Sequence, residues 1–397
     1  MDVIQKIDRQ KMSNALFYIV LTIELFFMVL EKSEISLPFI SHVFRITFLL
    51  TLISVFVAKH EKNEWIIILV VFAFTFLCYR LTGRNELLRF SMFVFAAKNI
   101  DIEKTMKYWF YFCLIGFSLI AVLALTGVIG DIYVDADFGR GSVERRYTLG
   151  FGHPNTLCGC VYVILLLWLW LYGKKARLVN YLAWIAGTVV LFKLSVSRTI
   201  ILIFFMTIAI AMVIRFVPGI VKEKWVYFLV GLVSPILCVI FSIAAAVVSK
   251  YRWIVENNGK DWSDGNYLVT KLDTILNGRI ANLYYDSQTH EGAIETWKLF
   301  SDRNSDKVFD MGWVRLFYWY GIIPASLIVL IILVLVYICY KNRDAWTALI
   351  VLSLGIYTVI EATFVSRYIG RNIVLPIAAT YIMSIIQHKD EAVRYAK

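Results

Sequence analysis

The sequence has little charge for its length. Only 17% of its 397 residues are charged, whereas 60% are hydrophobic, and the mean hydropathy is +0.71. A soluble core of this size cannot absorb so much apolar surface. The 12 tryptophans and 22 tyrosines suit the bilayer interface, where one end of the ring meets water and the other meets lipid. These features predict an all-α polytopic membrane protein with a single integral membrane domain over residues 1–397.

The cysteines lack the spacing of a disulfide framework or a metal site. All six lie within apolar runs (Cys78, Cys113, Cys158, Cys160, Cys238 and Cys339). The pair at 158 and 160 is too closely spaced for zinc, and no cluster of His and Cys is present. We therefore expect neither disulfides nor a zinc site. The pattern of a cleavable signal peptide is also missing, so the first apolar run is expected to remain as an anchor.

Apolar runs recur along the whole chain. Because a span needs about 20 apolar residues, they predict about twelve membrane-spanning helices, with eleven as the alternative. The runs lie at residues 15–30, 37–58, 65–79, 86–97, 106–129, 153–172, 178–195, 199–217, 225–249, 311–340, 345–364 and 370–387. The fourth is short and carries Arg89, so it could instead be a re-entrant or tilted helix.

The net charge of +11 is explained by the loops and does not indicate nucleic acid. Every second segment between the runs is basic, which is the pattern of the cytoplasmic side. This places both termini in the cytoplasm and the long polar segment, residues 250–310, outside. Loops of this length are usually functional. Leu268, Leu272 and Leu276 recur at helical spacing, so we expect this large loop to carry short amphipathic helices over an active site.

The short outer segments are rich in arginine. These residues are Arg80, Arg84, Arg140, Arg145, Arg146, Arg198, Arg367 and Arg371. Insertion does not require positive charge on this side, and guanidinium groups bind phosphate and carboxylate in a two-pronged way. We interpret them as a vestibule for a polyanionic or pyrophosphate-bearing ligand. Contact with lipid headgroups is the alternative.

A first motif leads into the sixth run and reads Arg-Arg-Tyr-Thr-Leu-Gly-Phe-Gly-His-Pro-Asn. Pro154 suits the first turn of a helix, whose free N–H groups and dipole favour an anion. Arg145 and Arg146 precede this helix start, and His153 and Asn155 flank the proline. We interpret these four residues as binding an anionic substrate, with an ordinary capped helix start as the alternative.

A second motif, Ser-Val-Ser-Arg-Thr at 195–199, forms a very short outer turn. An arginine this close to the membrane is costly unless it is paired or hydrated. We therefore interpret Arg198 as a phosphate ligand. The alternative is a side chain that reaches the interface by itself.

The long loop contributes three further candidates. Arg279 follows an Asn-Gly pair that breaks the helical pattern, and it is the best basic candidate there. His290 is a catalytic candidate, although a lone loop histidine is more often simply solvated. Asp310 comes just before an apolar run. It would accept a hydroxyl proton as a general base or satisfy backbone N–H groups as a helix cap.

Four charged residues fall within the apolar runs: Glu24, Arg45, Arg89 and Glu361. A charge at the centre of a span costs about 2.5–3.5 kcal/mol on insertion scales. We therefore expect these four side chains to be paired.

In their order and spacing, the motifs resemble the O-antigen polymerase/ligase superfamily, and most closely its Wzy-type polysaccharide polymerases. In that family an Arg precedes a Gly and then His-Pro-Asn at a span start, as in residues 146–155 here. A Ser-x-Ser-Arg follows, at 195–198, and a Gly-Arg lies in the large outer loop, at 278–279. An acidic residue or His then leads into a span ending in Gly-Ile-Ile, here 310–323. The resemblance covers roughly residues 100–380.

The resemblance implies a membrane glycosyltransferase (GT-C-like) architecture with one large extracytoplasmic loop, in the cytoplasmic membrane of a bacterium. Members transfer a glycan from an undecaprenyl-pyrophosphate carrier to a hydroxyl of an acceptor sugar, on the outer face, with no metal or other cofactor. Arg146, Arg198 and Arg279 would then neutralise the pyrophosphate leaving group. Asp310 stands where the related ligases have a His as the base, and Met311 replaces the usual Asn.

We therefore predict a polymerase of lipid-linked oligosaccharide repeat units, for a capsule, an exopolysaccharide or an O antigen. Its partners would be the lipid-linked donor and acceptor, membrane lipids, and chain-length regulator and flippase proteins. A ligase that moves a finished glycan to another acceptor is the nearest alternative. A flippase and a structural membrane protein are alternatives of other classes. A transporter should show internal repeats, and the sequence has no clear repeat.

Overall fold

The computed structural model describes residues 2–137, 142–257, 267–285, 290–303, 305 and 307–386. Helices make up nearly all of its regular structure. The long ones are α1 (Asp2–Lys32), α2 (Ile40–Val57), α3 (Lys62–Thr82), α5 (Ile102–Leu125), α6 (Pro154–Tyr172), α7 (Leu178–Ser195), α8 (Arg198–Phe216), α10 (Cys238–Asn257), α14 (Ile322–Asn342) and α15 (Ala345–Ile360). The shorter ones are α4 (Glu86–Ala96), α9 (Lys224–Gly231), α11 (Tyr267–Ile275), α12 (Arg279–Tyr285), α13 (Gly312–Tyr320) and α16 (Val374–Ile386), joined by short turns that include η3 (Leu232–Leu237) and η6 (Ile369–Arg371).

Nine helical stretches in the described residues are long and apolar enough to cross a membrane. The chain is therefore a polytopic, membrane-embedded helical protein. Each of the twelve predicted runs lies on helix, but three of them form helices of only 11, 16 and 13 residues, namely α4, α15 and α16. At about 1.5 Å per residue, these three are shorter than the hydrocarbon core of about 30 Å.

The run predicted at 311–340 is interrupted where α13 ends and α14 begins. Gly321 lies between the two helices with a φ of +92°, a conformation that side chains with a Cβ rarely adopt. A Cβ at this position would lie 2.5 Å from the Cα of Phe300. The glycine therefore allows the segment 299–301 to pass directly beside the chain.

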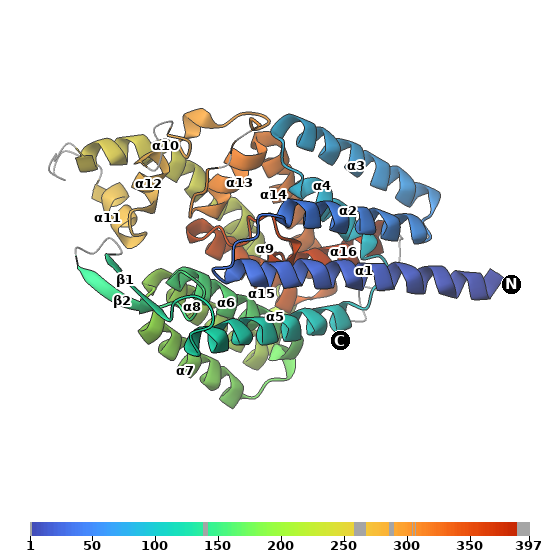
Figure 1. Ribbon diagram of the computed structural model, residues 1–397, viewed down its shortest axis with the longest axis horizontal. Helices are drawn as coiled ribbons and strands as arrows, with labels where there is room; N and C mark the ends of the chain where they lie inside the picture. The colour runs from blue at the N-terminus through green and yellow to red at the C-terminus, as the bar shows by residue number, and fades with distance from the viewer. Residues whose placement is uncertain are drawn as a thin grey trace.

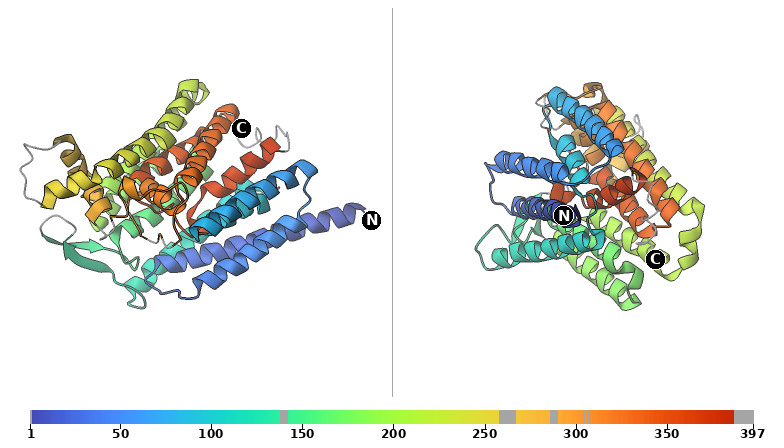
Figure 2. Two further views of the ribbon diagram at one scale, coloured as in Figure 1. Left: turned by 90° about the horizontal axis from the view of Figure 1, so that it is seen from above. Right: turned by 90° about the vertical axis from the view of Figure 1, so that its right-hand side faces the viewer.

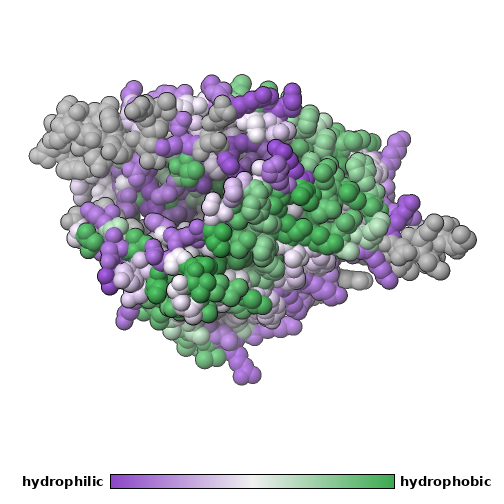
Figure 3. Space-filling view, viewed as in Figure 1, coloured by the Kyte–Doolittle hydropathy of each residue, from purple (hydrophilic) through white to green (hydrophobic). Residues whose placement is uncertain are grey.

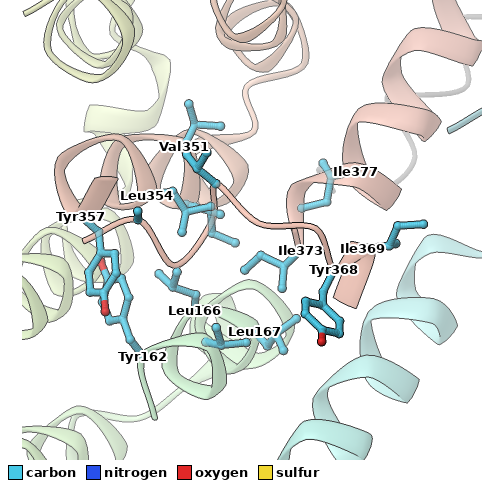
Figure 4. Close-up of a cluster of buried hydrophobic side chains, with 14 of the residues drawn as sticks. Tyr162, Leu166, Leu167, Val351, Leu354, Tyr357, Tyr368, Ile369, Ile373 and Ile377 are labelled. Atoms are coloured by element: carbon cyan, nitrogen blue, oxygen red, sulfur yellow. The ribbon is translucent and has the colours of Figure 1, made fainter. Parts of the chain in front are cut away.

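The helices pack around α6, the most buried of the apolar helices. Tyr162 of α6 stacks on Tyr357 of α15, with ring centroids 4.9 Å apart. Figure 4 shows these rings beside Leu166, Leu354 and Ile373 in one continuous apolar cluster. Burial of such side chains supplies about 25 cal/mol per Å² of apolar surface.

Two of the four charges within apolar runs pair with each other. Arg89 of α4 donates from Nη2 to Oε1 of Glu24 in α1 at 2.6 Å, and both side chains are buried. The expectation that all four side chains are paired is wrong for Arg45 of α2. It is exposed and makes no hydrogen bond or ion pair within the described residues, because its position faces outward from the helix bundle.

The segment between α5 and α6 is a β-hairpin, which the all-α prediction did not include. Strands β1 (Tyr133–Asp137) and β2 (Val143–Tyr147) pair antiparallel. Their sequences, Tyr-Val-Asp-Ala-Asp and Val-Glu-Arg-Arg-Tyr, alternate around a Gly-containing connection. That pattern is typical of a β-hairpin, but the long apolar runs on either side are the stronger signal in the sequence.

The hairpin, α11 and α12 lie together at one end of the long helices, and the N-terminus lies at the other (Figures 1 and 2). We call the first of these the hairpin end. Hydrophilic residues gather there, and the surface is hollowed between the hairpin and α11–α12 (Figure 3). Hydrophobic residues cover the sides of the neighbouring helices in the same view. Helices α11 and α12 belong to the segment predicted as a large loop over 250–310.

Candidate active site

A buried ion pair lies at the centre of the hairpin end. Nη2 of Arg279, at the start of α12, donates to Oε1 of Glu361 at 2.7 Å. Nε and Nη1 of the same guanidinium donate to the backbone carbonyls of Ile360 and Leu276, at 2.8 and 2.9 Å. Three of its five N–H groups are therefore used, and two remain for a ligand.

The backbone before Arg279 is shaped by its sequence. Asn277 and Gly278 both have positive φ, +59° and +76°, and they turn the chain sharply between α11 and α12. The Oδ1 atom of Asp273 then accepts the N–H of Ile280 at 2.7 Å, which caps α12. The other oxygen of Asp273 lies 2.9 Å from Nε of Arg252 in α10. The segment that carries Arg279 is thus attached to a long helix by a buried ion pair.

Glu361 is also connected to the first and second sequence motifs. Nδ2 of Asn155, in the first turn of α6, donates to Oε1 of Glu361 at 2.7 Å. Oδ1 of Asn155 in turn accepts a hydrogen bond from Oγ of Ser197 at 2.6 Å. The segments around 155 and 279 therefore meet at one carboxylate, and the segment around 197 joins them through Asn155.

Asp310 approaches the same arginine from the other side. Its Oδ2 lies 3.6 Å from Nε of Arg279, and its side chain is 61% exposed. It does not cap α13, because Met311 occupies the N-cap position and this helix has no side-chain cap. The carboxylate is therefore held near a cation and open to solvent. Gly312 allows α13 to lie this close to the end of α15, since a Cβ there would be 3.0 Å from the Cα of Ala362.

His153 is the N-cap of α6, and its Nδ1 accepts the N–H of Asn155 at 3.2 Å. Desolvation by the surrounding protein lowers the pKa of its imidazole. The charge of Asp310 raises that pKa, and the charges of Arg146 and Arg279 lower it further. His153 therefore lies within electrostatic reach of the carboxylate and both arginines.

The hairpin separates its two neighbouring arginines. Alternate residues of a strand face opposite sides, and the register sets Arg145 opposite Asp135. Arg145 is exposed and donates from Nε and Nη2 to both oxygens of Asp135, at 2.9 and 2.8 Å. Arg146 faces inward, is buried, and donates to Glu144 at 2.7 Å. Of the two predicted anion ligands, only Arg146 is on the protein-facing side of the hairpin.

Two other predicted residues lie at the same end with different surroundings. Arg198 is the first residue of α8 and is exposed, with no hydrogen bond or ion pair among the described residues. It directly follows Ser197, which places its backbone beside Asn155. His290 stacks on the ring of Tyr284 at 3.6 Å, and its Nδ1 lies 2.6 Å from the carbonyl oxygen of Tyr284. Arg140, one of the predicted outer arginines, is outside the described residues.

Glu361 is the residue that the sequence interpretation missed as part of this site. It was noted only as a charge within an apolar run. It is the first residue after α15, outside the apolar helix. Burial raises the pKa of its carboxyl to about 7, against the lowering effect of Arg279, and the charge of Asp310 adds to the rise. The signal in the sequence is that the apolar run 345–364 has a carboxylate, Glu361, close to its end.

A second ion pair, with a lysine beside it, lies next to the site. Arg371 of η6 forms an ion pair with Glu31 at the end of α1, and Lys32 lies beside them. Lys32 and Arg371 both line a narrow cavity together with Thr363, two residues after Glu361. This cluster adds positive charge to the hairpin end.

The arrangement combines an exposed carboxylate with a fixed guanidinium that has donors to spare. Such a pair can accept a proton at one atom and stabilise developing negative charge at another. Among the described residues, no group of three or more His, Cys, Asp or Glu side chains could hold a metal ion. Comparison of the chain with family models, with curated proteins and with solved structures gave no match.

Proposed function

We propose that the chain is a membrane glycosyltransferase that joins lipid-linked oligosaccharide repeat units into a polysaccharide. The observation that carries this proposal is the convergence of Arg279, Asp310 and Glu361 at one hydrophilic end of an otherwise apolar helix bundle. A lipid-linked oligosaccharide has polar sugars and an apolar carrier, and a boundary between a hydrophilic surface and an apolar bundle suits both parts. The order of motifs that resembles the Wzy-type polymerases provides independent support.

In the proposed reaction, Asp310 is the general base. It accepts the proton of an acceptor hydroxyl while that oxygen bonds to the anomeric carbon of the donor sugar. The bond from this carbon to the undecaprenyl pyrophosphate breaks, and the electron pair leaves with the pyrophosphate. The solvent exposure of Asp310 lets an acceptor sugar reach it, and its place 3.6 Å from Nε of Arg279 sets the carboxylate beside the departing anion.

The arginines would bind the leaving pyrophosphate. Arg279 has two N–H groups free for it, and Glu361 and two carbonyls fix the plane of its guanidinium. Because this orientation is set before the substrate arrives, no reorganisation is needed as the charge develops. Arg146 and Arg198 lie near the same helix starts and add positive charge. In this proposal the hairpin end faces the outside of the cytoplasmic membrane, and both termini lie in the cytoplasm.

The test is an extension assay with purified full-length protein and lipid-linked repeat units. We expect longer lipid-linked products on a gel, with a chelator present. Arg279→Ala, Arg198→Ala and Arg146→Ala should each abolish or strongly reduce extension, with intact folding checked by size-exclusion chromatography and thermal unfolding. Arg45→Ala is the matched control, because Arg45 is an exposed arginine on α2. Full extension by all three site variants would refute the arginine site.

The same assay separates the polymerase from its alternatives. Wild-type protein that transfers glycan only to a different acceptor, and never to a second repeat unit, would be a ligase. Movement of lipid-linked oligosaccharide across a vesicle membrane without any new glycosidic bond would refute the transferase proposal and indicate a flippase.

A further inference from the structure

A groove lies at the end of the bundle opposite the hairpin end. It runs between α9 with η3 on one side and α14 on the other, and its volume is about 370 Å³. One wall is formed by Tyr227, Gly231 and Ile236, and the other by Leu333, Val336 and Tyr340. None of these residues takes part in the site described above.

The groove exists because the helix on one side is irregular. Residues Leu232–Leu237 form a π-helical turn that contains Pro235, which has no backbone N–H to donate. Oγ of Ser234 donates to the carbonyl of Val351 in α15 at 2.8 Å, and so holds the turn toward α15. Gly231 has no side chain, so the space toward Val336 stays open. Turns of this type inside α-helices are frequent at functional sites.

The mouth of the groove is positively charged. Lys224 lines it and makes no ion pair within the described residues. Arg343 donates from Nη1 to the carbonyl of Lys222 at 2.7 Å and lies 4.8 Å from the ring centre of Tyr340. Nζ of Lys341 lies 5.5 Å from the ring centre of Tyr337. With Lys222, four basic residues therefore lie at one end of an apolar groove.

Two nearby acids offset only part of this charge. Glu223 is the one acidic residue within the sequence segment 218–224, and it is exposed. The second acid is Asp344, which follows Arg343, and its oxygens accept the N–H of Thr347 at 3.0 Å and the hydroxyl of Tyr381. The mouth thus retains an excess of positive charge, framed by tyrosine rings that favour the membrane interface.

We propose that this groove binds one acyl chain of an anionic phospholipid, with the phosphate of the lipid at Lys224. From Lys224 to Ile236 the groove extends about 18 Å, at 1.5 Å per residue. This is close to the thickness of one leaflet, about half of a 30 Å hydrocarbon core. An acyl chain fits the apolar walls, and a negative headgroup is complementary to the four cations, each of which is worth about fivefold in binding.

The proposal is tested by lipid binding to the purified full-length protein in detergent, read by native mass spectrometry. The probes are phosphatidylglycerol and phosphatidylcholine of equal chain length. We expect one phosphatidylglycerol to be retained, at least tenfold more tightly than phosphatidylcholine. Lys224→Met should remove about fivefold of this preference, and Gly231→Leu, which fills the groove, should remove binding of both lipids at this site.

Two matched variants serve as controls. Lys11→Met removes an exposed lysine of α1, and Gly187→Leu adds a leucine side chain on α7 where no atom lies within 4 Å of the added Cβ. Both should bind phosphatidylglycerol as the wild type does. Equal affinity for the two lipids in the wild type would overturn the headgroup part of the proposal. Wild-type binding by folded Gly231→Leu would overturn the groove as the site.

Discussion

Arg279 and Glu361 form a buried ion pair, 2.7 Å from Nη2 to Oε1, that joins the start of α12 to the end of α15. The pair fixes the arginine that we propose as the main pyrophosphate ligand. It also makes the site sensitive to pH, because burial outweighs the attraction of Arg279 and raises the pKa of Glu361 to about 7. Near neutral pH, this carboxylate is therefore present in both its protonated and its ionised form.

The first prediction concerns the pH dependence of activity and stability. Activity should rise as pH increases through about 7, because only ionised Glu361 is a full counter-charge for Arg279. Stability should change in the opposite direction. A folded-state pKa above the ordinary 4.5 means that the folded protein binds more protons between pH 4.5 and 7. Protonation of Glu361 therefore stabilises the folded protein at low pH. This stabilisation, on the order of 3 kcal/mol, is lost as the pH rises from 4.5 to 7.

Glu361→Gln removes this titration while keeping an oxygen that can accept from Arg279. Its free energy of unfolding, measured by denaturant titration in micelles, should lack the decrease between pH 4.5 and 7. Its extension activity should be low and nearly independent of pH in the same range. A variant with the pH profile of the wild type would show that another group titrates there.

A second prediction separates the proposed base from an ordinary surface carboxylate. Asp310→Asn should lower the rate of extension by about 10²–10⁴-fold, the usual contribution of general base catalysis, with little change in stability because the side chain is largely exposed. Asp302→Asn is the matched control, since Asp302 is equally exposed and pairs only with Lys298 among the described residues. Wild-type rates for Asp310→Asn would remove Asp310 from the mechanism.

The helical class of this chain was predictable because a bilayer imposes one simple constraint, that spans be long and apolar. The hairpin was not predicted, since ten residues of alternating pattern are a weak signal beside two long apolar runs. The break at Gly321 is also invisible in the apolar run 311–340, although the resemblance implies a span that ends there. Its cause is a close approach to Phe300, which is a contact between segments that hydropathy does not contain.

The candidate site was predictable only in part. Arginine in the short outer segments led to the prediction of Arg146 and Arg198, because insertion does not require positive charge on that side. Arg279 was predicted from its place after Asn-Gly in the long loop. The partner of Arg279 could not be identified, since Glu361 lies 82 residues away along the chain. Only the packing of both α12 and α15 against α10 brings the two residues close. The sequence likewise does not show that Asp310 lies near Arg279. It therefore does not decide whether Asp310 is a general base or a helix cap.

A third prediction follows from the register of the hairpin. Arg146→Ala should reduce extension by at least tenfold, because Arg146 lies on the buried face and electrostatically reaches His153. Arg145→Ala should change it less than threefold, because Arg145 is 55% exposed and already paired with Asp135. Each of these two variants serves as the control for the other in the extension assay. Equal losses would indicate that the outward face of the hairpin also contacts substrate.

The fourth prediction concerns the buried pair of Glu24 and Arg89. Arg89→Met should lower the free energy of unfolding by about 3–5 kcal/mol, because it leaves the charge of Glu24 buried without its partner. Thr47 still donates to Glu24 at 2.6 Å, but a neutral hydroxyl does not replace a cation. Adding Glu24→Gln should restore most of the loss, as a double-mutant cycle would show. Arg45→Met, at an exposed site, should stay within about 0.5 kcal/mol of wild type. An equal loss from Arg45→Met would mean that arginines of this region stabilise through lipid contact rather than through pairing.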